Sequence, residues 1–232
     1  MQDVRKKRVA IFDVDGTIFR SSLTILLMEQ LISDGVFPRK ARDMYLQQRR
    51  KWRDREGDYD DYIGALVESF KTSLKGIRYS ELEKAASEVV ARHQKETYRY
   101  TRDLLPILKE KGYYLLAISH SPKTILDKFC PKLGFDKVYG MLYETGPQER
   151  FTGNVLEEHL IYNKANVLKR AVEKEGLTLA YSIGVGDTES DIPFLEQVAK
   201  PICFNPNMRL YKYAQRMKWK VVVERKDVIY DI

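Results

Sequence analysis

Cysteine and long apolar runs are scarce in this chain of 232 residues. Its two cysteines, Cys130 and Cys203, lie far apart in different apolar segments, which predicts reduced core residues of a cytoplasmic protein rather than a disulfide or zinc pair. No apolar run approaches the roughly 20 residues that cross a bilayer, so no membrane partner is expected. The basic stretch 5–8 mimics a secretion signal, but Asp13 and Asp15 interrupt the apolar run after it too early.

Low-complexity tracts and internal repeats are also absent from the sequence. A hydrophobic content of 44% and a charged content of 31% predict a folded chain, long enough for one large domain or for a core with a small insert. The net charge of +7 favours anionic small substrates. The basic run 49–55 could mark a nucleic-acid surface, but acidic residues follow it at once, which favours a solvated helix end. We expect no nucleic-acid partner.

Hydrophobic periodicity predicts two kinds of region. Between 21 and 96 apolar residues recur at helical spacing, and no strand is expected. After residue 100, helices and strands alternate, with a hairpin around Gly146 and Gly153 and a helix from about 158 to 175. Such alternation predicts an α/β fold with a Rossmann-like, mostly parallel sheet and helices on both faces. The core would comprise residues 1–20 and 97–232, and the all-helical insert residues 21–96. The expected helices of this insert are 21–33, 40–53, 59–74 and 80–94.

The most informative segment is an apolar run that ends in two carboxylates, Asp13 and Asp15, followed by Gly16 and Thr17. The run predicts a buried strand, in which residues two apart share a face. Two carboxylates so close repel unless a cation neutralises them or one holds a proton. The pattern therefore indicates a hard-metal site with oxygen ligands, although an acidic turn after a strand would look the same.

A second buried-strand pattern, 113–118, ends in hydroxyl residues. Ser119 and Ser121 follow it, and Ser121 with Pro122 predicts a helix start with serine as the N-cap and proline at the first helical position. The backbone N–H groups and positive dipole end of such a junction suit a phosphate. An ordinary capped junction would carry the same residues.

A third strand pattern, 181–186, is followed by Asp187 and then by Asp191, four residues further on. In the first turn of a helix, Asp191 would complement the dipole; alternatively, Asp187 supplies a metal carboxylate and Asp191 supports it. Lys164 stands at the start of another predicted helix, where a lysine goes against the dipole preference.

Together these segments resemble the haloacid dehalogenase superfamily of phosphohydrolases. Asp13-Val14-Asp15-Gly16-Thr17 matches its first motif, Ser119 its second and Lys164 its third. The fourth motif matches the segment 186–191. The resemblance covers essentially the whole chain, and the helical insert resembles the cap of the phosphoserine-phosphatase-like branch, as does the hairpin at Gly153.

The resemblance implies phosphoryl transfer to an aspartate. Asp13 would be the nucleophile and Asp15 the general acid and base. Mg²⁺ would bind Asp13, the backbone carbonyl of Asp15, and Asp187, with Asp191 in support of Lys164 or of the metal. The implied phosphate-binding residues are Ser119, His120, Lys164, Thr17 and Gly16. Asp15 also argues for phosphate chemistry rather than dehalogenation, because the dehalogenases lack this second aspartate.

Substrate choice should lie in the cap. Phosphoserine phosphatases carry a cap glutamate and a cap arginine for the amino acid, but here the glutamate position holds Ser22 and the arginine region, 62–67, has no cation. A phosphoserine zwitterion would stay uncompensated, so we expect another small phosphorylated metabolite. The candidate cap contacts are Arg20, Ser22, Tyr45, Arg49 and Trp52.

Two alternatives stay open. A phosphotransferase or phosphonate hydrolase could use the same scaffold, and a phosphonate hydrolase would need a cap lysine for an imine. Lys40, Lys51 and Lys71 are present, but none has an apolar sequence context that would lower its pKa. A catalytically idle module that binds phosphorylated ligands is the other alternative. We expect a monomer or homodimer.

Overall fold

The computed structural model describes residues 6–157 and 161–232. Eight strands of this part of the chain form one sheet, in the order β4-β3-β2-β1-β5-β6-β7-β8. The six inner strands are parallel, whereas β4 and β8 pair antiparallel at the two edges. The α/β, Rossmann-like fold class is therefore confirmed. The strands are β1 (Lys7–Phe12), β2 (Tyr114–Pro122), β3 (Lys137–Thr145), β4 (Phe151–Leu156), β5 (Leu177–Gly186), β6 (Lys200–Phe204), β7 (Lys220–Arg225) and β8 (Val228–Asp231).

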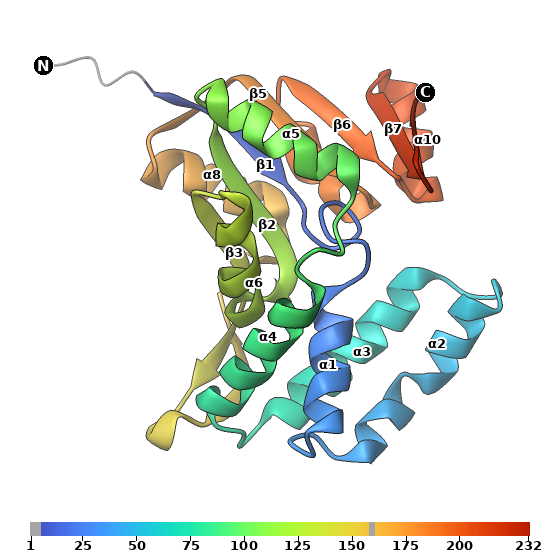
Figure 1. Ribbon diagram of the computed structural model, residues 1–232, viewed down its shortest axis with the longest axis vertical. Coiled ribbons are helices and arrows are strands. Elements are labelled where there is room, and N and C mark those ends of the chain that lie inside the picture. Colours follow the sequence, from blue (N-terminus) through green and yellow to red (C-terminus); the bar gives the residue numbers. More distant parts are fainter. Residues whose placement is uncertain (1–5, 158–160) are drawn as a thin grey trace, which may run out of the picture.

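Helices cover both faces of the sheet (Figure 1). Alternate residues of β1 explain why, because Ala10 and Phe12 pack with apolar residues of α5 and α6, whereas Val9 and Ile11 pack with those of α8, α9 and α10. No described helix is both long enough and apolar enough to cross a bilayer. The helices of the core are α5 (Arg99–Glu110), α6 (Lys123–Phe129), α8 (Lys164–Lys174), α9 (Ile192–Leu195) and α10 (Met208–Met217).

Four α-helices between β1 and α5 form a separate group beside the carboxyl ends of the central strands (Figure 1). They are α1 (Leu23–Ser33), α2 (Leu46–Arg53), α3 (Tyr59–Leu74) and α4 (Tyr79–His93). Their buried side chains join the same apolar cluster as α5 and α6, so this helical cap shares a core with one face of the sheet. The domain boundaries at 20/21 and 96/97 stay a prediction.

Several boundaries differ from the sequence expectations. The single helix expected over 40–53 is a 3₁₀ helix, η1 (Arg39–Met44), followed by α2. Strand β2 runs through Ser121 and Pro122, and α6 begins at Lys123 without a side-chain cap, so the expected serine cap is wrong. Helix α8 begins at Lys164 rather than near 158; residues 158–160 lie outside the described part.

Other short elements complete the chain. Residues 189–195 form a 3₁₀ turn, η4 (Glu189–Asp191), followed by the short α9. The remaining 3₁₀ turns are η2 (Cys130–Leu133) and η3 (Pro147–Glu149). Strand β8 was not expected from the sequence. The hairpin expected around Gly146 and Gly153 is the antiparallel pair β3–β4.

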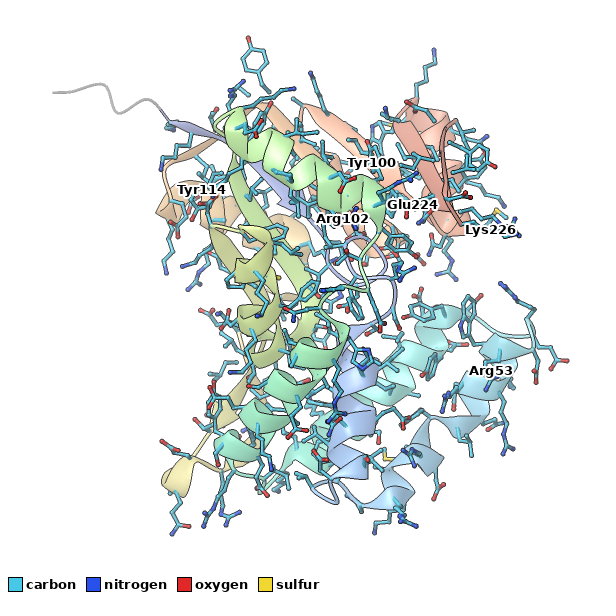
Figure 2. The ribbon with its side chains drawn as sticks, viewed as in Figure 1. Arg53, Tyr100, Arg102, Tyr114, Glu224 and Lys226 are labelled. Carbon is cyan, nitrogen blue, oxygen red and sulfur yellow. The ribbon has the colours of Figure 1, made fainter. Side chains whose placement is uncertain are left out.

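The two connections between cap and core lie side by side. The Arg20 amide donates to the Glu96 carbonyl over 2.9 Å, and the Tyr98 amide to the Ile18 carbonyl over 2.9 Å. Glu224 of β7 then accepts hydrogen bonds from the free amides of Arg99 and Tyr100 at the start of α5, beside which Figure 2 shows it. Both cap connections are therefore anchored to the core next to the carboxyl ends of the strands.

Candidate active site

Three carboxylates and one lysine meet at the carboxyl ends of β1 and β5. Asp13 follows β1, Asp187 follows β5, Lys164 opens α8 and Asp191 ends η4. Lys164 Nζ lies 2.6 Å from Asp13 Oδ1 and 2.5 Å from Asp191 Oδ1. One oxygen each of Asp13, Asp187 and Asp191 falls within 4.8 Å of the others. Three segments that are distant in sequence thus converge at the sheet edge where ligands of α/β folds bind.

Burial sets the electrostatics of this cluster. Lys164 is only 2% exposed, and the adjacent Asp13 and Asp191 carboxylates outweigh its desolvation and raise its pKa, so it stays charged. Desolvation raises the pKa of Asp13 to about 7 although Lys164 opposes the change, with Asp191 and Asp15 contributing repulsion. Desolvation, then Asp13, raises the pKa of Asp187 well above its ordinary value. The carboxylates carry more negative charge than one ammonium balances.

The glycine of the first motif is needed for a close approach to Asp187. Gly16 has φ of +78°, and a Cβ at this position would lie 2.1 Å from Asp187 Oδ2. Any larger residue would therefore be strained and would displace that carboxylate. Thr17 holds the other oxygen, because its hydroxyl donates to Asp187 Oδ1 over 3.1 Å. Thr17 does not line the cavity, so its expected contact with phosphate has no support in this geometry.

Asp15 occupies a different polar environment from Asp13. Its Oδ1 accepts from the Leu23 amide over 2.6 Å, and its Oδ2 accepts from the hydroxyls of Ser119 and Ser121 over 2.9 and 2.6 Å. Desolvation nevertheless raises the pKa of Asp15. A buried carboxyl group with a raised pKa holds its proton more readily and can deliver it to a leaving group.

Asp191 has both of its oxygens engaged by the chain. Oδ1 faces Lys164, and Oδ2 accepts from the amides of Asp187 and Thr188 over 2.9 and 3.2 Å. The Thr188 and Asp191 pair also forms a capping box on η4. The two interpretations of Asp191, helix cap and support of the site, are therefore compatible.

His120 lines the cavity next to Ser119. Its Nε2 lies 3.2 Å from the Ile161 carbonyl oxygen. Burial, then the charge of Lys164, lowers its pKa to about 4, so the imidazole is neutral near pH 7. A neutral ring of this kind contributes hydrogen bonding but no positive charge.

The carboxylate cluster opens into a cavity of about 580 Å³ between core and cap. The core contributes Asp13, Asp15, Gly16, Ser119, His120, Ser121, Lys164 and Asp187, and the rim Thr188, Ser190, Asn205 and Asn207. From the cap and its connections come Arg20, Ser21, Ser22, Thr24, Ile25, Trp52, Tyr59, Asp60, Tyr62, Ile63, Val67 and Tyr98. A space of this size accommodates a small metabolite.

Two of the expected cap contacts lie elsewhere. Tyr45 is fully buried and its hydroxyl donates to Glu29 over 3.0 Å, and Arg49 faces the same carboxylate at 3.8 Å. Neither residue is among the described residues that line the cavity, so their expected substrate contact has no support. Arg20, Ser22 and Trp52 do line it, although Ser22 also caps α1 by accepting from the Ile25 amide.

Sequence reasoning missed several cavity residues. Ser121, expected to cap a helix, instead donates to Asp15, and its hydroxyl lies 2.6 Å from that of Thr24 on the cap. The sequence signal for this contact was the pair of hydroxyl residues, Ser119 and Ser121, that follows a predicted strand. Tyr59 and Tyr62 follow the helical spacing of ordinary core residues, so nothing in the sequence marked them as cavity walls.

A divalent metal fits this donor set. Mg²⁺ prefers oxygen ligands, and the crowded Asp13 and Asp187 carboxylates have raised pKa values that a cation would reverse. Because Gly16 has no side chain, Asp187 Oδ2 can lie close to its backbone. Asp191 is already satisfied by the chain, which leaves Asp13 and Asp187 as the available carboxylate ligands.

Comparison with known proteins agrees with this geometry. Residues 10–196 match the model of the haloacid dehalogenase-like hydrolase family. A histidinol-phosphatase of Neisseria meningitidis is 27% identical over 222 residues, which cover 93% of this chain and 98% of that protein. A phosphoserine phosphatase of Methanocaldococcus jannaschii is 22% identical, covering 97% and 95% of the two chains. A structure of substrate-bound phosphoserine phosphatase superimposes with a TM-score of 0.64 at 19% identity, covering 96% and 95%.

The chain belongs to the haloacid dehalogenase-like hydrolase family, whose model spans most of its length. Within the family it falls on the phosphoserine-phosphatase-like branch, as its relatives and structural neighbours show. Both the superfamily expected from the four motifs and the branch expected from the helical insert and the hairpin at Gly153 are confirmed. The roles of individual residues are not tested by these similarities and stay predictions.

Proposed function

We propose that this protein, a phosphatase of the haloacid dehalogenase-like family, is a Mg²⁺-dependent phosphomonoesterase that forms an acyl phosphate on Asp13. Its substrate would be a small phosphorylated metabolite other than phosphoserine. The observation that carries the proposal is the buried contact of Lys164 with both Asp13 and Asp191, beside Asp187. This cluster holds a nucleophilic carboxylate, a fixed positive charge and a potential metal ligand in one cavity.

In the first step, Asp13 would attack phosphorus while Asp15 protonates the leaving alkoxide. The raised pKa of Asp15, caused by burial, supports its role as the acid. In the second step, Asp15 would take a proton from water as that water attacks the phosphoryl group on Asp13. The serine hydroxyls that now face Asp15 hold its side chain in one orientation for both transfers.

The remaining residues would position the phosphoryl oxygens. Lys164 supplies a charge fixed by Asp191, and Ser119 and the backbone at Gly16 line the same end of the cavity. His120, which is neutral, would contribute hydrogen bonding only. Asp13, the backbone carbonyl of Asp15, and Asp187 would hold Mg²⁺, which when bound offsets the repulsion between phosphate and carboxylate.

The nature of the cap argues against phosphoserine as the preferred substrate. No lysine, arginine or histidine occurs among the described residues of 21–96 that line the cavity, so no cap cation is available for a substrate carboxylate. Phosphoserine and histidinol phosphate both belong in a substrate panel, since relatives of this chain are named for each. The absence of a cap lysine from that lining also weighs against an imine-forming phosphonate hydrolase.

The test is phosphate release from sugar, nucleotide, amino-acid, amine and lipid phosphates, with Mg²⁺ and after removal of divalent metal by EDTA. We expect turnover that depends on Mg²⁺ and ranks phosphoserine below the best substrate. Turnover that is unaffected by metal removal, or phosphoserine as the best substrate, would contradict the corresponding part of the proposal.

A second experiment addresses the intermediate. The Asp15→Asn variant should still transfer the phosphoryl group of p-nitrophenyl phosphate to Asp13, because this leaving group needs no protonation. It should then hydrolyse the phosphorylated Asp13 slowly, because no base activates the water. Acid quenching followed by peptide mass spectrometry should then find the phosphoryl group on Asp13. Absence of a label under burst conditions would argue for direct attack by water. Transfer to added alcohols at the expense of hydrolysis would favour the phosphotransferase alternative.

A further inference from the structure

The cap side of the cavity has an aromatic wall. Trp52 of α2 and Tyr59 of α3 lie with ring centroids 5.2 Å apart at 57°, and Tyr59 and Tyr62 lie 6.2 Å apart at 75°. All three residues line the cavity, as does Tyr98 from the connection to α5. Rings inclined to one another in this way do not form a flat stack.

The same wall carries negative rather than positive charge. Asp60, next to Tyr59, lines the cavity, and its carboxyl group lies beside that of Glu189 on the core. Arg209 is the nearby cation, 2.7 Å from Glu189, 4.0 Å from Asp60 and 3.8 Å from Asp58. Its side chain is 67% exposed, and one guanidinium faces three carboxylates. The carboxylates of Asp58, Asp60 and Glu189 therefore outnumber the one guanidinium that faces them.

Arg20 is the one cation among the described lining residues besides Lys164. It is exposed and belongs to the connection between core and cap, where its amide bonds to Glu96. Lys164 is already occupied by two carboxylates. No lysine or arginine thus stands among the described residues of the aromatic wall that line the cavity, whereas ring faces and a carboxylate are the groups that attract a cation.

We propose that the wall formed by Trp52, Tyr59 and Asp60 selects phosphate monoesters whose organic part carries a positively charged nitrogen and no carboxylate. The inference rests on the proposed phosphomonoesterase function and narrows its substrate class. The phosphate would lie at Lys164, and the cationic group would lie on the rings of Trp52 and Tyr59 with Asp60 as the counter-charge. A substrate carboxylate in this position would meet ring faces and Asp60, both of which repel it.

Trp52 already neighbours a cation on the solvent side. The guanidinium carbon of Arg55 lies 5.8 Å from the centroid of the Trp52 ring. Burial, followed by the charges of Asp15 and Asp187, raises the pKa of Tyr59, which keeps its hydroxyl neutral. Both rings therefore present neutral, electron-rich faces near negative charge, the arrangement that favours a cationic guest.

Two matched pairs of substrates test the proposal. Phosphocholine and 3,3-dimethylbutyl phosphate have the same shape and differ in the positive charge. Phosphoethanolamine and phosphoserine differ in one carboxylate. We expect kcat/KM to favour phosphocholine and phosphoethanolamine, each by about tenfold, which corresponds to one desolvated cation–π contact. Equal values within the first pair, or a preference for phosphoserine in the second, would overturn the inference.

Variants assign the preference to the wall. Asp60→Asn and Trp52→Leu should each lower the ratio of kcat/KM for phosphocholine to that for 3,3-dimethylbutyl phosphate, whereas Trp52→Phe should restore part of it. Because the readout is a ratio on one protein sample, a general loss of folded enzyme does not mimic the result. Asp61→Asn is the matched control, since Asp61 is exposed on the same turn of α3 and does not line the cavity. An unchanged ratio in both Asp60→Asn and Trp52→Leu would overturn the assignment.

Binding measurements separate this inference from the proposed function. The Asp13→Asn variant can be titrated calorimetrically with both members of the first pair in the presence of Mg²⁺. Tighter binding of phosphocholine without turnover by the unmodified protein would support the cation-selective wall and contradict the phosphatase mechanism. Turnover of p-nitrophenyl phosphate with no discrimination within either pair would support the mechanism and contradict the wall.

Discussion

The two halves of the cavity are built from different interactions. At the core end, buried ionic groups from three separate segments satisfy one another, with Lys164 between Asp13 and Asp191. At the cap end, the walls are aromatic rings, and the charged contacts, such as those of Arg209, are exposed. A buried ionic cluster tolerates few substitutions because removing one member leaves the others uncompensated, whereas a ring surface can change with modest cost. The core end is therefore suited to one chemistry and the cap end to a changeable substrate.

The largest expected effect is the loss of catalysis when a carboxylate at the core end is replaced. Asp13→Asn should reduce phosphate release by about ten-thousand-fold or more, because the amide is not a nucleophile. The protein should stay folded, since Lys164 keeps its contact with Asp191. Phosphate-release assays would measure activity, and thermal unfolding monitored by circular dichroism would measure stability. Asp103→Asn, which alters an exposed carboxylate paired with Arg102, is the control. Retained turnover in Asp13→Asn would remove this residue from the mechanism.

The second effect concerns stability. Lys164→Met should lower the free energy of unfolding by about 3–5 kcal/mol, because it leaves two buried carboxylates without their partner. Lys123→Met removes an exposed ion pair with Asp127 and should change this free energy by about 0–1 kcal/mol. Urea denaturation of both variants without metal gives the comparison. Equal losses would mean that burial does not distinguish these two ion pairs.

These contrasts explain how much the sequence could predict. The apolar run of β1 and the carboxylates after it predicted the buried strand and the acidic sheet edge, because hydrophobicity and charge repulsion act locally. The convergence of Lys164 on Asp13 came from the family resemblance, since a contact across 151 positions has no local signal. Tyr59, unlike Trp52, escaped prediction as part of the wall because an aromatic residue at helical spacing fits a buried core equally well.

The third effect is the pH dependence of the stabilisation of the folded protein by Mg²⁺. In the folded protein without metal the pKa of Asp13 is raised from 3.8 to about 7, chiefly by burial. The folded state therefore binds more protons than the unfolded state between these values, and the contribution of Asp13 to stability falls as pH rises through that range. Mg²⁺ bound to the ionised carboxylate would offset this loss. Thermal unfolding should show a larger stabilisation by Mg²⁺ at pH 8 than at pH 5.

Asp13→Asn provides the control for this dependence. The variant lacks the titrating group and one metal ligand, so both the stabilisation by Mg²⁺ and its change with pH should be smaller. Stabilisation by Mg²⁺ that is equal at the two pH values in the unmodified protein would contradict metal binding at this carboxylate.

The smallest expected effect sharpens the comparison within the cap. Arg49 faces Glu29 at 3.8 Å with 37% of its side chain exposed, and it does not line the cavity. Arg49→Gln should therefore change the free energy of unfolding by less than about 1 kcal/mol and kcat/KM by less than about twofold. Trp52→Leu, one turn further along the same helix, should alter substrate preference because its ring lies on the cavity. Steady-state kinetics with the matched esters would measure kcat/KM and substrate preference in both variants. If Arg49→Gln lost as much substrate preference as Trp52→Leu, the cap's basic residues, rather than its rings, would recognise the substrate.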